Sequence, residues 1–107
     1  MPPIPIVPRF KLMVKFDVRP DQYERYYRYL LGEFIPGLQN MQLYPFMVWH
    51  TAYGNYPMRQ VEFVAESLEI VRTAFEQDRW QVLEEGLKEH TLNYERKVVH
   101  FQDRFQF

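Results

Sequence analysis

"FKLMVKFDV", residues 10–18, alternates apolar side chains with polar or flexible ones along its whole length. Such strict period-two alternation is typical of a β-strand that buries one face. The apolar face consists of Phe10, Leu12, Val14, Phe16 and Val18. The opposite face consists of Lys11, Met13, Lys15 and Asp17. The stretch therefore predicts a strand that packs one side against helices and leaves a mixed surface on the other.

Downstream of this strand, the apolar residues change to helical spacing. Pro20 and Asp21 suit a helix N-terminus, and Pro36-Gly37 is expected to end this helix. Its buried stripe is expected to consist of Tyr23, Tyr27, Leu30 and Phe34. A second helix of about 22 residues is predicted to begin after Ser67 as its N-cap, with a kink near Gln77–Asp78.

The remaining segments predict three more strands. The second strand is expected over residues 43–53 and the third over residues 59–65, joined by a turn at Gly54-Asn55 and Pro57. A fourth strand, centred on residues 98–101, is expected to continue into an aromatic tail. The resulting order is βαββαβ.

This order has a simple spatial solution. Right-handed crossovers place the strands in the order 4-1-3-2, which gives a four-stranded antiparallel sheet with both helices on one face. The predicted fold class is therefore α+β, of the ferredoxin-like type. Residues 10–107 are expected to form this single domain, and residues 1–9, with four prolines, an extended N-terminal arm.

Composition excludes several classes of function. Among 107 residues, 13 Lys and Arg offset 14 Asp and Glu, so no net charge attracts nucleic acid or acidic membranes. The chain has no cysteine, which removes thiol nucleophiles and thiolate metal sites and fits a cytoplasmic protein. No apolar run reaches the ~20 residues of a membrane span. The aromatic content of 18% favours a large interface or a flat-walled pocket.

The second strand suggests a partner for the open face of the sheet. One of its sides is expected to carry Leu43, Met47, Trp49 and Tyr53, and the other Tyr44, Phe46, Val48 and Ala52. Apolar residues on both sides imply cover on both sides. A four-strand face measures about 400 Å², whereas an ordinary interface takes about 800 Å² per partner. A homodimer in which the tail, with Phe101, Phe105 and Phe107, crosses to the second subunit would supply that cover.

Two phrases resemble a known group. "EFIPGLQ" (residues 33–39) and "SLEIVRTAFEQDRWQVLEEGL" (residues 67–87), in a βαββαβ chain, are similar to the dimeric α+β barrel superfamily, and to its antibiotic-biosynthesis-monooxygenase branch in particular. The resemblance implies a dimer with two sheets packed face to face and a pocket in each subunit between sheet and helices. Members of the group include cofactor-free oxygenases of quinols or polyphenols, haem-degrading enzymes, and proteins without a known reaction.

His50 and its neighbour Trp49 are the first candidates for chemistry. Adjacent strand residues point to opposite faces, so the two cannot share one pocket. His50 either packs against a helix or acts as a catalytic base, since imidazole titrates near pH ~6.5. Tyr23 and Tyr27 either belong to the core or hold a phenolic substrate oxygen as catalytic partners of His50. The candidate walls of the substrate site are Trp49, Phe46 and Phe63.

Cofactor chemistry has little support in the sequence. Haem-degrading members of the group use an asparagine on the first strand and a tryptophan on the third. This chain has no asparagine on its first strand, and its third strand has Phe63 instead of a tryptophan. His50, His90 and His100 are too scattered for a metal site. We therefore expect no cofactor. Two functions stay open: a cofactor-independent monooxygenase acting on a small aromatic substrate, and a non-catalytic dimeric module that binds a ligand or a protein.

Overall fold

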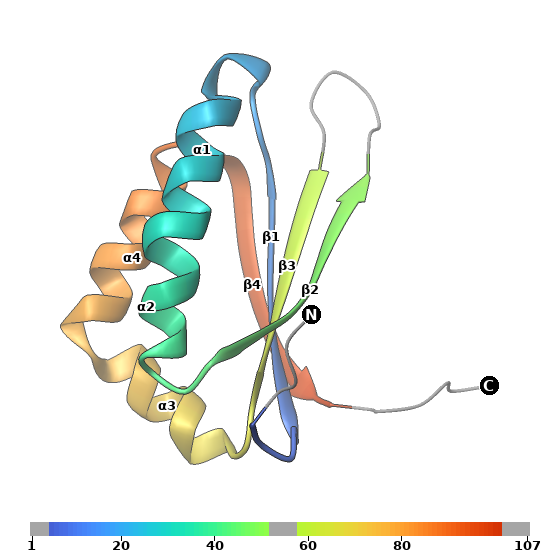
Figure 1. Cartoon of the computed structure of the whole chain (residues 1–107), viewed down its shortest axis with the longest axis vertical. Coiled ribbons are helices and arrows are strands. Elements are labelled where there is room, and N and C mark those ends of the chain that lie inside the picture. The colour runs from blue at the N-terminus through green and yellow to red at the C-terminus, as the bar shows by residue number, and fades with distance from the viewer. Residues whose placement is uncertain (1–4, 52–57, 102–107) are drawn as a thin grey trace.

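The computed structural model describes residues 5–51 and 58–101, without the side chains of His50 and Thr51. Within these residues the chain runs through β1 (Phe10–Asp17), β2 (Tyr44–Thr51), β3 (Met58–Ala65) and β4 (Leu92–His100). The helices are α1 (Tyr23–Tyr29), α2 (Ile35–Gln39), α3 (Leu68–Glu76) and α4 (Asp78–Lys88). All four helices lie on one side of the sheet (Figure 1). The strand order β2-β3-β1-β4, antiparallel throughout, confirms the predicted ferredoxin-like arrangement.

β1 forms the centre of the sheet, as its alternation predicts. Leu12, Val14 and Phe16 are at most 1% exposed and face the helices. Across the open face, Met13 lies opposite Glu62 of β3 on one side and opposite Lys97 of β4 on the other. The first strand therefore divides the molecule into a helix-covered layer and an open sheet face.

The first helical region is a series of short pieces. A 3₁₀ turn (Pro20–Gln22) leads into α1, and a π-helical turn (Leu30–Phe34) connects α1 to α2. The buried row recurs at every fourth position, at Tyr26, Leu30, Phe34 and Leu38. Four residues exceed one α-helical turn of 3.6, so the wider π turn keeps this row directed at the sheet.

Two predictions about this region are wrong. Tyr23 and Tyr27 are 42% and 48% exposed, because the row through Tyr26 faces the sheet instead. Pro36-Gly37 does not end the helix, because the wider π turn before Pro36, in which the N–H of Ile35 bonds to the carbonyl of Leu30, runs directly into α2. The carbonyl of Pro36 accepts from the N–H of Asn40, and the helix ends at Gln39.

The second helical region agrees with its prediction. The hydroxyl of Ser67 accepts a hydrogen bond from the N–H of Ile70 at 3.2 Å and caps α3. The backbone of Gln77 is extended (φ −79°, ψ 141°), which separates α3 from α4 and confirms the predicted kink. α4 then buries Trp80 and Leu83 beneath the sheet.

A β-bulge in β2 changes which residues share a face. Pro45 pairs with Phe63 and Met47 with Glu62, so Phe46 is an extra residue without a partner in the register. The predicted grouping of Leu43 with Met47 and Trp49 is therefore wrong: Leu43 is fully buried in the core beneath the helices. The predicted positions of Ala52 and Tyr53, the turn at residues 54–57 and the tail beyond Phe101 lie outside the described residues. Among the described helices, none combines the length and apolar character needed to cross a membrane.

Candidate functional site

A groove of ≈290 Å³ lies between the first helical region and the edge formed by β2 and β3. Its walls are mainly aromatic and aliphatic, and one charged side chain lines it. The residues that form the groove include Tyr23, Tyr26, Tyr27, Leu31, Val48 and Arg59. The resemblance stated above implies a pocket between sheet and helices, and this groove occupies that place. We refer to it as the α1 groove.

Arg59 supplies the charge of the α1 groove. It lies in β3 on the helix side, and only 8% of its surface is exposed. Its Nη1 is buried and has no hydrogen-bond partner among the described residues, and no carboxylate of this part of the chain lies within ion-pair distance of it. The guanidinium carbon lies 5.4 Å from the centroid of the Tyr23 ring, a cation–π contact.

Tyr26 lies at the base of the same groove and is 1% exposed. Burial raises the pKa of its phenol to about 12, although the positive charge of Arg59 acts in the opposite direction. Tyr26 therefore keeps its proton at neutral pH. A buried, protonated hydroxyl beside a guanidinium gives the groove two hydrogen-bond donors at one end.

Tyr23 and Tyr27 form the outer rim of the groove. Their rings are nearly parallel, at 9°, with centroids 5.8 Å apart. Both are partly exposed, as is Val48 of β2 across the opening at 56%. This rim presents flat and aliphatic surface to a ligand, which is the kind of wall that favours an aromatic ring.

The structure places the other candidate residues apart from this rim. Trp49 lies on the open sheet face, Phe46 packs edge-on against Phe101 at 5.2 Å, and Phe63 packs against Phe34 within the core. The backbone of His50 pairs with that of Arg59, and its side chain lies outside the described residues. Tyr23 and Tyr27 are thus brought together with Arg59, while the three proposed wall residues are not.

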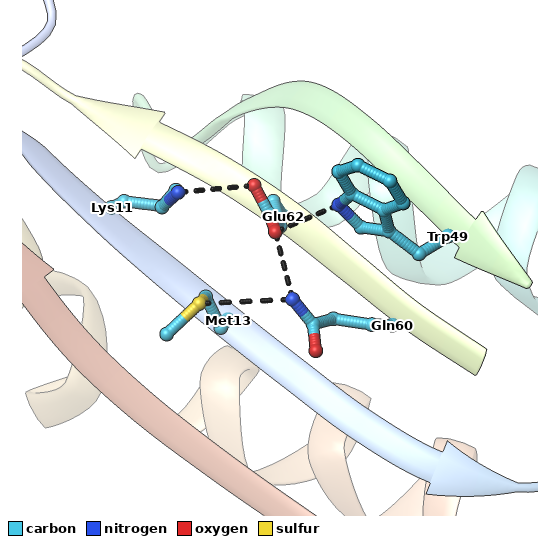
Figure 2. A network of polar contacts seen from close by, with 5 residues as sticks. All are labelled: Lys11, Met13, Trp49, Gln60 and Glu62. Atoms are coloured by element: carbon cyan, nitrogen blue, oxygen red, sulfur yellow. Dashed lines mark hydrogen bonds and ion pairs between the residues drawn. The ribbon is translucent and has the colours of Figure 1, made fainter. Parts of the chain in front are cut away.

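Trp49 belongs to a polar cluster on the open face, shown in Figure 2. Glu62, 5% exposed, accepts hydrogen bonds from the indole N–H of Trp49 at 2.9 Å and from Gln60 at 2.7 Å. Lys11 forms an ion pair with the same carboxylate at 3.3 Å, and Gln60 also donates to the sulfur of Met13 at 3.8 Å. Every buried charge in this cluster is compensated, in contrast to Arg59.

A larger hollow of ≈420 Å³ lies beside the cluster on the open face. Its lining is dominated by flexible charged side chains, among them Lys15, Glu95 and Lys97. Lys15 and Glu95 form an exposed ion pair at 3.3 Å, which contributes little to binding or stability. Among the described residues, no group of three His, Asp or Glu side chains is placed to hold a metal ion.

The two innermost polar groups of the groove, Tyr26 and Arg59, are not among the site residues predicted from the sequence. A signal for Arg59 was present, because period two places it on the same side of its strand as Val61, Phe63 and Ala65, which are buried. A charged residue at the end of a strand's buried face indicates either the edge of the hydrophobic core or a functional site.

No family model matches the sequence, and no curated protein matches it. A NIPSNAP family protein from Agrobacterium tumefaciens is structurally similar, with a TM-score of 0.65, 16% identity, and coverage of 89% of this chain and 87% of that one.

Two further solved structures show the same fold. An antibiotic biosynthesis monooxygenase-like protein from Caulobacter crescentus has a TM-score of 0.66 and 7% identity over 90% of this chain and 92% of its own. A dimeric ferredoxin-like protein from an uncultured marine organism has a TM-score of 0.64 and 14% identity over 94% of each chain. These likenesses confirm the predicted resemblance at the level of the fold.

Proposed function

We propose that this protein is a homodimer that binds a small aromatic molecule in the α1 groove of each subunit. The observation that carries the proposal is the groove itself: a stacked tyrosine pair and aliphatic side chains surround two buried donors, Arg59 and Tyr26. Ligand pockets in proteins combine mainly apolar walls with a few convergent polar groups. The α1 groove has this composition, whereas the larger hollow on the open face does not.

The homodimer is supported by the open face. Trp49 is 52% exposed there, although its indole N–H is already hydrogen-bonded to Glu62. An exposed tryptophan held in place on a sheet face is suited to burial against a second sheet. The dimeric ferredoxin-like neighbour agrees with this arrangement. Sedimentation is expected to give about twice the 13.2 kDa chain mass, and a monomer at micromolar concentration would contradict the assembly.

The reaction that we propose is cofactor-independent oxygenation of a quinol- or polyphenol-like substrate. Two observations support this reaction: the α1 groove, and the fold that the chain shares with an antibiotic biosynthesis monooxygenase-like protein. In this mechanism His50 removes a proton from the substrate, and Tyr23 or Tyr27 holds the substrate oxygen at the rim. The electron-rich anion then reacts with O₂, which serves as the oxidant: one oxygen atom bonds to a ring carbon, the O–O bond breaks, and the other oxygen atom leaves as water with two hydrogens of the substrate, which becomes a quinone.

Oxygen uptake with a panel of quinols and polyphenols tests this reaction. The wild-type protein is compared with His50→Ala and with the control His100→Ala, because His100 lies in β4 at the far edge of the sheet, where its ring packs against that of Phe10 at a tilt of 36°. We expect turnover in the wild type and in His100→Ala, and its loss in His50→Ala. Equal rates in all three would remove His50 from the mechanism. Binding without turnover in the wild type would instead identify a non-catalytic binding module.

A further inference from the structure

The geometry of the α1 groove points to an aryl carboxylate as its ligand, with the carboxylate held by Arg59 and the ring lying against Tyr23 and Tyr27. This inference rests on the proposed function, since it names the chemical class that the groove would take.

The argument begins with the unpaired charge of Arg59. A guanidinium always carries its charge, and a charge removed from water lowers stability unless a counter-charge compensates for it. Only 8% of the surface of Arg59 is exposed, so the residue is 92% buried, yet its Nη1 has no hydrogen-bond partner among the described residues. The aromatic neighbours of the guanidinium, Tyr26 and the Tyr23 ring at 5.4 Å from the guanidinium carbon, are both neutral and supply no counter-charge. Among the described residues, therefore, no negative charge compensates for the guanidinium in the groove.

Other buried charges in the molecule show what the missing partner would look like. Glu84, 9% exposed, pairs with Arg96 at 2.6 Å and accepts from the hydroxyl of Tyr94 at 2.9 Å. That site combines a carboxylate, a guanidinium and a phenol. The α1 groove has the guanidinium of Arg59 and the protonated phenol of Tyr26 but lacks the carboxylate.

The shape of the groove selects the rest of the ligand. A planar guanidinium can donate two parallel hydrogen bonds to the two oxygens of a carboxylate. A neutral amide of the same shape has only one such oxygen and carries no charge, so it binds the guanidinium less tightly. Tyr23 and Tyr27 stack at 9° and offer a flat surface, and the volume of ≈290 Å³ is of the size that accommodates a small bicyclic ring. A protein segment that entered the groove would instead need to supply an acidic side chain to Arg59.

The test uses 2-naphthoate and its neutral counterpart of nearly the same shape, 2-naphthamide. Calorimetric titration of the wild-type protein is expected to give about 10- to 100-fold tighter binding for the carboxylate than for the amide, the range of a hydrogen-bonded charge pair. In Arg59→Met this preference is expected to disappear. In the control Arg79→Met, whose arginine forms only an exposed ion pair with Glu33, the preference is expected to remain.

The possible results separate the inference from the proposed function. Equal binding of carboxylate and amide by the wild type overturns the inference and leaves the groove as an aromatic site. A carboxylate preference that survives in Arg59→Met also overturns it, because the anion would then bind elsewhere. No binding of either probe overturns both proposals and leaves the groove to a protein segment. Melting curves of Arg59→Met exclude unfolding as the cause of any loss.

Discussion

Replacing Arg59 by methionine is expected to make the ligand-free protein more stable, although it removes the charged group of the site. Methionine keeps the length and flexibility of the arginine stem and fills a buried space without a charge. The substitution therefore isolates the free energy of burying a guanidinium that has no counter-charge among the described residues.

The expected size follows from two opposing contributions. Replacing buried charged groups by apolar ones of similar volume stabilises proteins by about 1–4 kcal/mol. The cation–π contact of Arg59 with Tyr23, at 5.4 Å, is worth about 1 kcal/mol and is lost in the variant. The free energy of unfolding should therefore rise by up to about 3 kcal/mol, and the melting temperature by up to about 15 °C for a domain of this size.

The matched control is Arg96→Met, the same substitution on the same side of the sheet. Arg96 pairs with the buried carboxylate of Glu84 at 2.6 Å, so its removal leaves that charge uncompensated. Urea unfolding followed by circular dichroism should show opposite signs, with Arg59→Met stabilised and Arg96→Met destabilised by about 2–3 kcal/mol. If Arg59→Met is destabilised as much as Arg96→Met, Arg59 has a partner and the reasoning is refuted.

Three further results are expected. Glu62→Ala should lose about 2–3 kcal/mol in urea unfolding, because three donors of the open-face cluster lose their acceptor. Gly86→Ala should lower the melting temperature, because a Cβ at this position would collide with the hydroxyl of Tyr29 and break the hydrogen bond of that hydroxyl to a backbone carbonyl. Gly32→Ala is the control and should leave the melting temperature unchanged, because a Cβ there meets only open space. Because folding raises the pKa of Tyr26 from 10.0 to about 12, its contribution is complete below pH 10 and is lost as the pH rises to 12. Tyr26 alone should therefore lower the stability by about 1.4 kcal/mol per pH unit in that window, and Tyr26→Phe should remove this part of the dependence while the parts due to Tyr29 and Tyr94 remain.

The fold was predictable because local periodicity and tertiary packing agree in most segments. The alternation of residues 10–18 specifies both the central strand and its buried side, and no tertiary contact overrides it. Ser67 caps α3 through a bond three residues along the chain, which a sequence pattern records directly. These features depend on neighbours in sequence, so they can be recognised without coordinates.

The site was less predictable because it depends on small shifts in register. One extra residue at Phe46 moves Leu43 and Trp49 to opposite sides of the sheet. The only local sign of that bulge is Pro45, which fits an edge strand equally well without a bulge. In the first helical region, a π turn selects Tyr26 rather than Tyr27 as the inward tyrosine. The groove itself, and the absence of a counter-charge for Arg59 in the part of the chain that the structure describes, depend on packing between β3 and α1, which are distant segments of the chain.

The most direct test of the central claim, that the α1 groove is the ligand site, is to map 2-naphthoate on the ¹⁵N-labelled protein by the movement of its backbone amide signals. We expect the largest shifts at Tyr26, Leu31 and Arg59, which line the α1 groove. Shifts confined to Lys15 and Glu95, around the larger hollow of the open face, would contradict the claim.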